Sequence, residues 1–156
     1  MIVRKCTPAD KAIWVEMNRE FMDKELCGNE FWTETRDRGN ADLENAFDAA
    51  LKAEPSIILL IFENEEGETV GFVNLNTVFS IWSNGDAMIV DDFYIREDYR
   101  GRGYGKEGLV LVEKFALDNN IKRIQFHSNL DDENAAKIWD EIGYYPIDVK
   151  FYMRYI

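Results

Sequence analysis

The chain has 156 residues, of which 46% are hydrophobic and 13% aromatic, a length and composition that suit one globular domain with its own core. Its formal net charge of −12 would repel phosphates, which argues against nucleic acid as a partner. Residues 1–7 contain no apolar signal region, and no apolar run approaches the roughly 20 residues of a membrane span. We therefore expect a single domain over residues 1–156, located in the cytoplasm and without a membrane partner.

Cysteine and histidine are too scarce to build common metal or disulfide sites. Cys6 and Cys27 lie in unrelated contexts, which predicts reduced, mostly buried thiols rather than a disulfide framework or a zinc site. His127 is the single histidine, so a multi-histidine metal site is excluded and few ways remain to build a Ser-His-Asp triad. We expect no metal.

Hydrophobic periodicity and turn residues divide the chain into alternating helices and strands. Trp14, Met17 and Phe21 share one helical face, and Pro55 stops a second helix. In chain order we predict a strand at 2–6, a turn at 7–10 leading into the first helix, a connection at 26–40, a helix at 42–53, strands at 56–62, 69–79 and 87–95, a helix at 104–119, a strand at 121–129, a helix from 133 or 134 to 142, and a strand at 151–156. This order predicts an α/β (α+β) fold whose strands are mostly antiparallel at first and cross over after residue 95.

The most informative stretch is 90–106, where an aromatic strand is followed by Gly101, Gly103 and Gly105 and then by an amphipathic helix. Glycines at alternate positions let a ligand approach the backbone amides, and a helix N-terminus favours anions, so a phosphate group is the expected ligand. The spacing is not that of the dinucleotide-binding fingerprint, and Glu107 after Lys106 excludes the P-loop. An ordinary mobile glycine loop is the alternative.

The pattern Arg100-x-x-Gly103-x-Gly105 resembles the acyl-CoA pyrophosphate loop of the GNAT N-acetyltransferases. A downstream segment from Asn134 to Tyr144, with Trp139 and Gly143, is similar to the family's second conserved segment. The resemblance implies a mixed, mostly antiparallel central sheet flanked by helices on both faces, and acetyl-CoA as cosubstrate. The cofactor-binding residues that it implies are Phe93, Tyr94, Ile95, Arg100, Gly101, Arg102, Gly103, Tyr104, Gly105, Lys106 and Asn134, with core packing as the alternative for the side chains of the first three and helix capping for the last.

Asp91 and Asp92 are unusual because a carboxylate pair in a largely buried strand is costly unless it is solvated, paired or used. Alternation along a strand should send the two side chains to opposite faces. The stretch is similar to one in the diamine (polyamine) acetyltransferases, and this resemblance implies that Asp91 is the general base, which accepts a proton from an ammonium acceptor. Asp92 is then a candidate acceptor contact, as is Trp32 in the connection at 26–40. A strand-end carboxylate bonded to a turn is the structural alternative for Asp91.

Trp139 stands where the family usually has a tyrosine general acid. Its indole N–H can donate a hydrogen bond but is far too weak an acid to protonate a thiolate. Tyr144, Tyr145 and Tyr104 are the candidate acids, with Tyr144 preferred, and solvent is the alternative.

These observations predict direct transfer of an acetyl group from acetyl-CoA to a primary amine, on a small cationic acceptor that the negative net charge would attract. The alternatives are a protein lysine or N-terminal acetyltransferase, and a degenerate CoA-binding module that regulates without turnover. Members of the family often dimerise, so the resemblance also allows a homodimer.

Overall fold

The computed structural model describes residues 1–27, 32–128, 133–150, 152 and 154, with the backbone alone for 133–136. Its helices and strands follow one another as a mixed α/β chain. In order they are β1 (Ile2–Lys5), η1 (Pro8–Asp10), α1 (Lys11–Glu25), α2 (Thr33–Arg36), α3 (Asn40–Lys52), β2 (Ile57–Glu63), β3 (Thr69–Ser80), β4 (Gly85–Ile95), η3 (Glu97–Tyr99), α4 (Tyr104–Asp118), β5 (Arg123–Phe126) and α5 (Glu133–Glu141).

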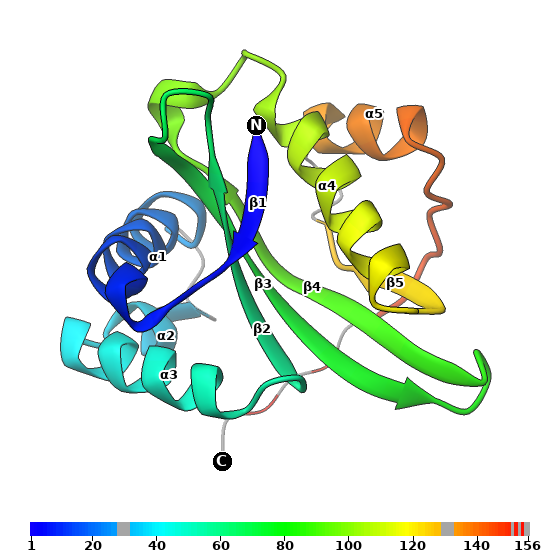
Figure 1. The fold of residues 1–156 in the computed structure, drawn as a ribbon, viewed down its shortest axis with the longest axis horizontal. Helices are drawn as coiled ribbons and strands as arrows, with labels where there is room; N and C mark the ends of the chain where they lie inside the picture. The colour runs from blue at the N-terminus through cyan, green and yellow to red at the C-terminus, as the bar shows by residue number, and fades with distance from the viewer. Residues whose placement is uncertain (28–31, 129–132, 151, 153, 155–156) are drawn as a thin grey trace.

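The strands of the described residues form one sheet in the order β1-β2-β3-β4-β5. The first three pairings are antiparallel, and β4 pairs with β5 in parallel. A parallel pair needs a crossover connection, and α4 supplies it. Helices α1, α2 and α3 lie on one side of the sheet and α4 on the other, with α5 beside α4 (Figure 1). The predicted fold class is confirmed.

Two apolar clusters, one on each face, hold the layers together. Phe72 and Tyr94 belong to the cluster under α1 and α3, where the most buried helix side chains are Met17 and Phe47, both with 0% exposure. Val73 belongs to the cluster under α4. Adjacent strand residues thus point to opposite clusters, as the pleat requires. This division decides which side chains of β3 and β4 face α1.

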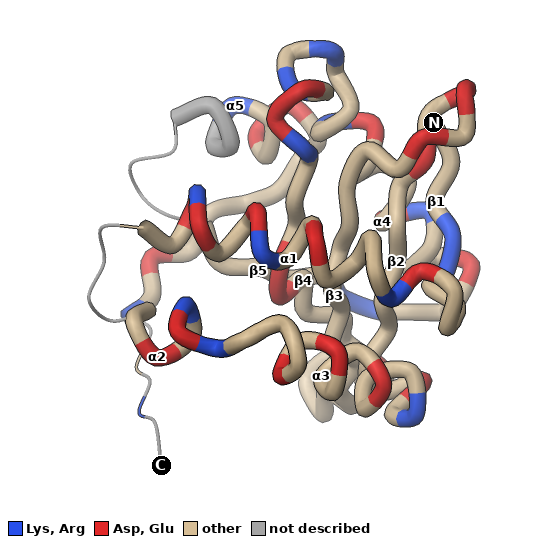
Figure 2. The backbone as a smooth tube through the Cα atoms, turned by 90° about the vertical axis from the view of Figure 1, so that its left-hand side faces the viewer, with Lys and Arg blue, Asp and Glu red and all other residues tan. Residues whose placement is uncertain are grey.

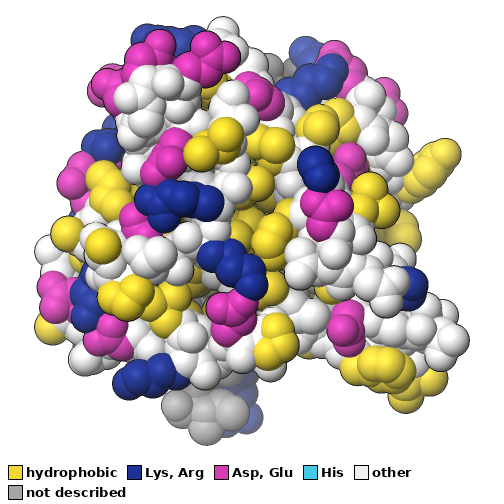
Figure 3. Space-filling view, viewed as in Figure 1, with side chains coloured by type: hydrophobic (Ala, Val, Ile, Leu, Met, Phe, Trp, Pro, Cys, Tyr) yellow, Lys and Arg dark blue, Asp and Glu magenta, His cyan; other side chains and the backbone are white. Residues whose placement is uncertain are grey.

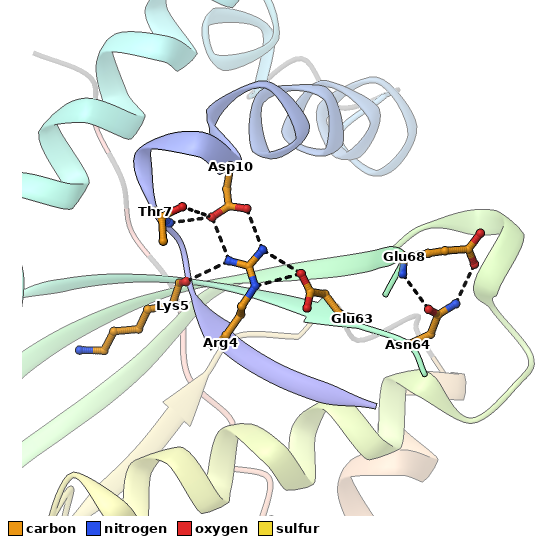
Figure 4. A network of polar contacts seen from close by, with 7 residues as sticks. All are labelled: Arg4, Lys5, Thr7, Asp10, Glu63, Asn64 and Glu68. Atoms are coloured by element: carbon orange, nitrogen blue, oxygen red, sulfur yellow. Dashed lines mark hydrogen bonds and ion pairs between the residues drawn. The ribbon is translucent and has the colours of Figure 1, made fainter. Parts of the chain in front are cut away.

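A polar network ties β1 to β2 and to the start of α1 (Figure 4). The Arg4 guanidinium donates to both carboxylate oxygens of Asp10, at 2.9 and 2.8 Å, and pairs with Glu63 at 2.7 Å. Asp10 also accepts from the backbone N–H and the hydroxyl of Thr7. Because Arg4 donates these hydrogen bonds, the pKa of the buried Asp10 carboxyl lies well below its ordinary value.

The structure differs from the sequence-based expectations at a few places. The connection at 26–40 contains the short helix α2, and β5 is shorter than the strand expected at 121–129. Cys6 is buried as expected, but the expectation of burial is wrong for Cys27, which is exposed. The strand expected at 151–156 lies largely outside the described residues. None of the helices within the described residues is long and apolar enough to cross a bilayer.

The helical face formed by α1, α2 and α3 and the tip of the β3–β4 hairpin differ in the side chains that they expose. Acidic positions are spread over α1, α2 and α3, which cover one face of the sheet (Figure 2). The β3–β4 hairpin projects from the body and exposes apolar side chains at its tip, where Phe79 is 69% exposed and Trp82 94% exposed (Figure 3, lower right).

Candidate active site

The glycine loop forms a cradle of backbone amides before α4. Gly101 and Gly103 have φ angles of 73° and 86°, and Gly103 is the N-cap of the 15-residue helix. A Cβ atom added at Gly101, Gly103 or Gly105 would meet nothing within 4 Å. Within the described part of the chain, the amides of residues 101–106 donate to no backbone acceptor, and the first N–H after them to do so is that of Glu107, which donates to the carbonyl oxygen of Gly103. The loop therefore offers open space beside uncommitted donors, which fits an anionic phosphate group.

The three cationic side chains predicted to bind the cofactor differ in their interaction partners. Arg100 pairs with Glu25 of α1 at 2.6 Å, and its Nε donates to the carbonyl oxygen of Ile95 at 2.9 Å. Lys106 pairs with Glu141 of α5 at 2.8 Å. The Arg102 guanidinium lies 5.6 Å from the ring centroid of Tyr99 on the exposed loop. Arg102 is therefore the cation that would need the least rearrangement to meet a phosphate.

Beyond Val90, strand β4 has an edge that no described strand pairs with. The β4–β5 ladder ends at the pair Val90↔Phe126, while β4 continues to Ile95. The N–H of Arg96 donates to Val70 on the β3 side, so by alternation Phe93 and Ile95 direct their backbone groups to the opposite side, where β5 has ended. An extended chain that carries amide groups, such as the arm of CoA, would fit this edge. Phe93 and Ile95 stay candidates to bind it through their backbone groups, whereas the backbone groups of Tyr94 face β3.

A β-bulge at Asp91 overturns the expected directions of the two carboxylates. Asn74 pairs with Asp92 and Leu75 pairs with Val90, so Asp91 is an extra residue in β4. Extra residues break the alternation of side chains. Asn74 Nδ2 donates to Asp92 at 2.9 Å and Asn76 Nδ2 donates to Asp91 at 3.1 Å. Since the two asparagines are two residues apart on β3, both carboxylates lie on one face, and the prediction of opposite faces was wrong.

The face that the carboxylates share is the one covered by α1. The indole N–H of Trp14 donates to Asn74 Oδ1 at 3.0 Å, which turns the Asn74 amide so that its Nδ2 points to Asp92. Asn74 Nδ2 also lies 3.4 Å from Oδ1 of the buried Asn18. Burial raises the pKa of Asp92 above its ordinary value, the hydrogen bond from Asn74 lowers it, and the charge of Asp91 raises it further. Asp91, by contrast, is exposed.

The predicted residues on and after α5 cluster around the end of β5. Trp139 stacks on Phe126 with a centroid distance of 3.7 Å, and Tyr144 lies 5.1 Å from the same ring. Burial raises the pKa of the Tyr144 phenol, as do the charge of Glu113 and the hydrogen bond between the two side chains. A raised pKa makes a phenol a weaker acid, which counts against Tyr144 as the proton donor. Asn134 lies in α5, and its side chain is outside the described residues.

The remaining candidates lie apart from this cluster. Tyr104 opens α4 and packs edge-on against Tyr99 at 6.3 Å, while Tyr145 is 91% exposed. Trp32 is half-buried immediately before α2, and its role as an acceptor contact stays a prediction. A separate cavity of about 320 Å³ lies between α4 and β5, next to Tyr144 and away from the glycine loop.

Sequence reasoning missed Asn74, Asn76 and Trp14, which hold the carboxylate pair. A signal for the asparagines was present, because two of them stand at alternate positions of an otherwise apolar strand and so share a face. Sequence reasoning also missed that Arg100 forms an ion pair with Glu25 of α1 and that Lys106 forms one with Glu141 of α5.

Comparison with known proteins identifies the family. The model of the Acetyltransferase (GNAT) family matches residues 19–144. The uncharacterized N-acetyltransferase YycN of Bacillus subtilis is 31% identical over 58 residues, and the match spans 37% of each chain. An aminoglycoside N(6')-acetyltransferase type 1 of Stenotrophomonas maltophilia is 22% identical over 155 residues, which cover 97% of this chain and 91% of that enzyme. The crystal structure of a probable acetyltransferase superposes with a TM-score of 0.81 at 17% identity, covering 100% of this chain and 98% of that one, which shows the fold.

The fold, the amide cradle and these relatives define an acyl-CoA-dependent N-acyltransferase. The chain belongs to the GNAT acetyltransferase family. The family that the sequence motifs predicted is thereby confirmed.

Proposed function

We propose that the protein transfers an acetyl group from acetyl-CoA directly to a primary amine of a small cationic acceptor. The observation that carries the proposal is the carboxylate pair Asp91 and Asp92, which share the α1 face at the point where β4 leaves β5. Two carboxylates on one face can hold an ammonium group and accept its proton, whereas a neutral acceptor would leave both negative charges uncompensated.

Acetyl-CoA supplies an acyl group activated as a thioester. The fit of the chain to this cosubstrate rests on the open amide cradle of the glycine loop and on the open edge of β4. In the net reaction a carbon–nitrogen bond forms, the carbon–sulfur bond breaks, the amine loses a proton and the departing sulfur gains one. Residues Gly101 to Lys106 would hold the pyrophosphate, and Phe93 and Ile95 would bind the arm through their backbone groups.

The environments of the two carboxylates support Asp92 as the general base and Asp91 as the acceptor contact, which reverses the roles expected from the sequence. An effective general base has a pKa closer to neutrality than an ordinary carboxyl group, and burial moves Asp92 in that direction. Exposed Asp91 is suited to attract and contact the ammonium group. Asp92→Asn should therefore lower turnover at saturating acceptor by about 10²- to 10⁴-fold. Asp91→Asn should mainly raise the acceptor KM.

Several features support a small polycationic acceptor. Acidic positions outnumber the basic positions interspersed with them on the face that α1, α2 and α3 form (Figure 2), and the relative from Stenotrophomonas is named for an aminoglycoside acceptor. Two carboxylates could contact two ammonium groups of one molecule. Acceptors of this class include polyamines and aminoglycosides.

The test is an acceptor screen with acetyl-CoA that follows thiol release. The panel contains a diamine, a polyamine, an aminoglycoside, an arylamine and lysine-containing and free N-terminal peptides. The expected result is turnover of a small cationic amine, with the losses described for the two variants. Turnover of peptides alone would instead establish a protein acetyltransferase. CoA binding without turnover of any amine would establish a regulatory module.

Light scattering in the presence and absence of CoA tests the homodimer, which stays a prediction.

A further inference from the structure

A chain of hydrogen bonds runs from α1 across β3 to the carboxylate of Asp92 on β4. The indole N–H of the buried Trp14 donates to Asn74 Oδ1 at 3.0 Å, and Asn74 Nδ2 donates to Asp92 Oδ2 at 2.9 Å. Asn74 Nδ2 also lies 3.4 Å from Oδ1 of the buried Asn18. Asn18 is itself fixed, because its Nδ2 donates to the backbone carbonyl oxygen of Trp14 at 2.8 Å. Two buried side chains of α1 therefore contact both ends of the Asn74 amide.

These contacts leave the Asn74 amide one orientation. An indole nitrogen only donates hydrogen bonds, and an ionised carboxylate only accepts them. Turning the amide over would set its Nδ2 against the indole N–H of Trp14 and its Oδ1 against the carboxylate of Asp92. The rings of Phe47 and Phe72, whose centroids lie 5.3 and 6.4 Å from that of Trp14, hold the indole in place. The packing of the indole therefore decides that Asp92 receives an N–H donor.

A donor at this place keeps a half-buried carboxyl group in the form that can accept a proton. Burial raises the pKa of Asp92 and so does the charge of Asp91, whereas the hydrogen bond from Asn74 lowers it. Without that hydrogen bond, a larger fraction of Asp92 would be protonated near neutrality and unable to act as a base. The hydrogen bond engages Oδ2 of Asp92, so Oδ1 is the oxygen that would take the proton of an ammonium group.

Other charged groups on this side of the sheet are paired with one another. The titratable side chains that α1 and β4 place there, with the arginine that follows β4, are Asp91, Tyr94, Arg96, Glu16 and Glu20. Arg96 pairs with Glu16 at 2.7 Å and with Glu20 at 2.8 Å. The hydroxyl of Tyr94 donates to Glu20 at 3.5 Å. The charge that acts on Asp92 is therefore that of Asp91, and its donor is the neutral amide of Asn74 rather than a cation.

We infer that Trp14 is a positioning residue for acetyl transfer, because its indole N–H orients the Asn74 amide that holds the Asp92 carboxylate as the proton acceptor. The inference rests on the proposed role of Asp92 as general base. In that reaction the ammonium proton passes to Asp92, the carbon–nitrogen bond forms, and the carbon–sulfur bond breaks with its electron pair going to sulfur. Asp92 then releases its proton to solvent, and the sulfur takes one up. Trp14 acts through Asn74 rather than on either substrate.

The kinetic test compares Trp14→Phe with a matched control, Trp82→Phe. Phenylalanine at 14 keeps a ring beside Phe47 and Phe72 and removes the N–H donor, whereas Trp82 is 94% exposed at the hairpin tip. The measurement is the pH dependence of kcat with one saturating amine throughout. Losing the hydrogen bond to the charged carboxylate should move the acid limb of the Trp14→Phe profile to higher pH by about one pH unit, which lowers turnover on that limb about tenfold. Trp82→Phe should leave the profile in place.

The direction of this change separates positioning from packing. If the smaller ring only loosened the core, water reaching Asp92 would lower its pKa, and the acid limb would move to lower pH instead. Asn74→Leu should move the limb to higher pH at least as far as Trp14→Phe. The double variant should match Asn74→Leu alone, because the indole acts through the amide. Asn76→Leu, on the same face of β3, removes the donor to Asp91 and should change the acceptor KM while the acid limb stays in place.

A titration of the wild-type protein by NMR needs no turnover. The chain has four tryptophans, and the indole ¹H–¹⁵N resonance missing from Trp14→Phe belongs to Trp14. Since the indole and the carboxylate share the Asn74 amide, the Trp14 resonance should shift with pH at the same midpoint as the side-chain carboxyl carbon of Asp92. The Trp82 resonance should not follow that midpoint. In Trp14→Phe the midpoint of Asp92 should lie at higher pH than in wild type.

The outcomes distinguish this inference from the proposed function. Wild-type protein that turns over no amine would overturn the proposed function and this inference with it. Turnover by wild type, together with an acid limb that stays in place or moves to lower pH in Trp14→Phe, would overturn the inference alone. So would a Trp14 resonance that does not follow the titration of Asp92. If Trp14→Phe does not fold, the Trp14 resonance is identified by backbone assignment, and the wild-type titration decides.

Discussion

Substitutions in the glycine loop separate the fit of a phosphate from the stability of the fold. Gly103→Val adds a branched side chain to open space at a residue whose φ is 86°. Left-handed backbone costs an L-residue about 1–2 kcal/mol. In a chain of this size each kcal/mol lowers the melting temperature by roughly 2–4 °C, so we expect a decrease of about 2–8 °C without global unfolding.

Gly67 provides the matched control, because its φ is 79° and an added Cβ likewise meets nothing within 4 Å. It lies in the turn between β2 and β3, outside the glycine loop. Gly67→Val should lose the same stability as Gly103→Val and keep full CoA affinity. Gly105→Ala is the converse variant. Alanine favours a helical backbone over glycine by up to about 1 kcal/mol, so this change should not lower stability, yet its methyl group occupies the cradle.

Calorimetric titration with CoA measures the effect on binding. A hydrogen bond to a charged group contributes about 1.5–3 kcal/mol, so displacing the phosphate from one amide should weaken binding by about 10- to 100-fold. We expect this loss for Gly103→Val and a smaller loss for Gly105→Ala. Equal CoA affinity in wild type and a folded Gly103→Val variant would refute the proposal that the amides of the glycine loop bind the phosphate. A matching loss in Gly67→Val would show that affinity follows stability rather than contact.

Three further predictions concern charge. Asp10→Asn should lower the free energy of unfolding by about 2–4 kcal/mol at pH 7, a loss moderated because the partner Arg4 side chain is 37% exposed. Since the folded pKa of Asp10 is lowered, the wild-type advantage should be complete above about pH 4 and decline as pH falls toward that lowered pKa, which denaturant titrations at several pH values would detect. Asp92→Asn should raise the free energy of unfolding at pH 7. Because the pKa of Asp92 is raised in the folded state, the wild type loses stability as pH rises from about 4 through the folded pKa. If the difference in melting temperature between wild type and Asp92→Asn did not change across that range, the burial argument would be contradicted. Finally, the KM of a cationic acceptor should rise with salt, since exposed charges are screened within about 10 Å at 0.1 M. A KM that does not change with salt, together with faster turnover of arylamines than of cationic amines, would contradict electrostatic recruitment.

Local sequence patterns predicted the parts of the fold that depend on neighbouring residues. The order of helices and strands followed from periodicity, and the glycine loop followed from three glycines placed between a strand and a helix. The short helix α2 was missed because Trp32 to Arg36 lies among charged residues without an apolar stripe.

The side-chain arrangement of the site was less accessible, because it depends on pairing between strands. Alternation in β4 was assumed to be regular, and nothing within β4 itself shows that Leu75 pairs with Val90 while Asn74 pairs with Asp92. The Nε1 atom of Trp139 is buried without an acceptor among the described residues, which could not be foreseen either. A missing hydrogen-bond partner is a property of all the packed neighbours together.

The bulge at Asp91 makes the candidate site sensitive to chain length as well as to residue type. The extra residue follows directly after Val90, the last β4 residue that pairs with β5, and bulges bend the strand that carries them. A deletion of Asp91 should make the β3–β4 ladder regular and straighten β4 toward β5, which would close the edge proposed to hold the acyl donor. A substitution at the same position leaves the residue count intact and keeps that edge open. Relatives that take other acceptors should therefore tolerate other residues here but conserve the spacing between the hairpin and the glycine loop.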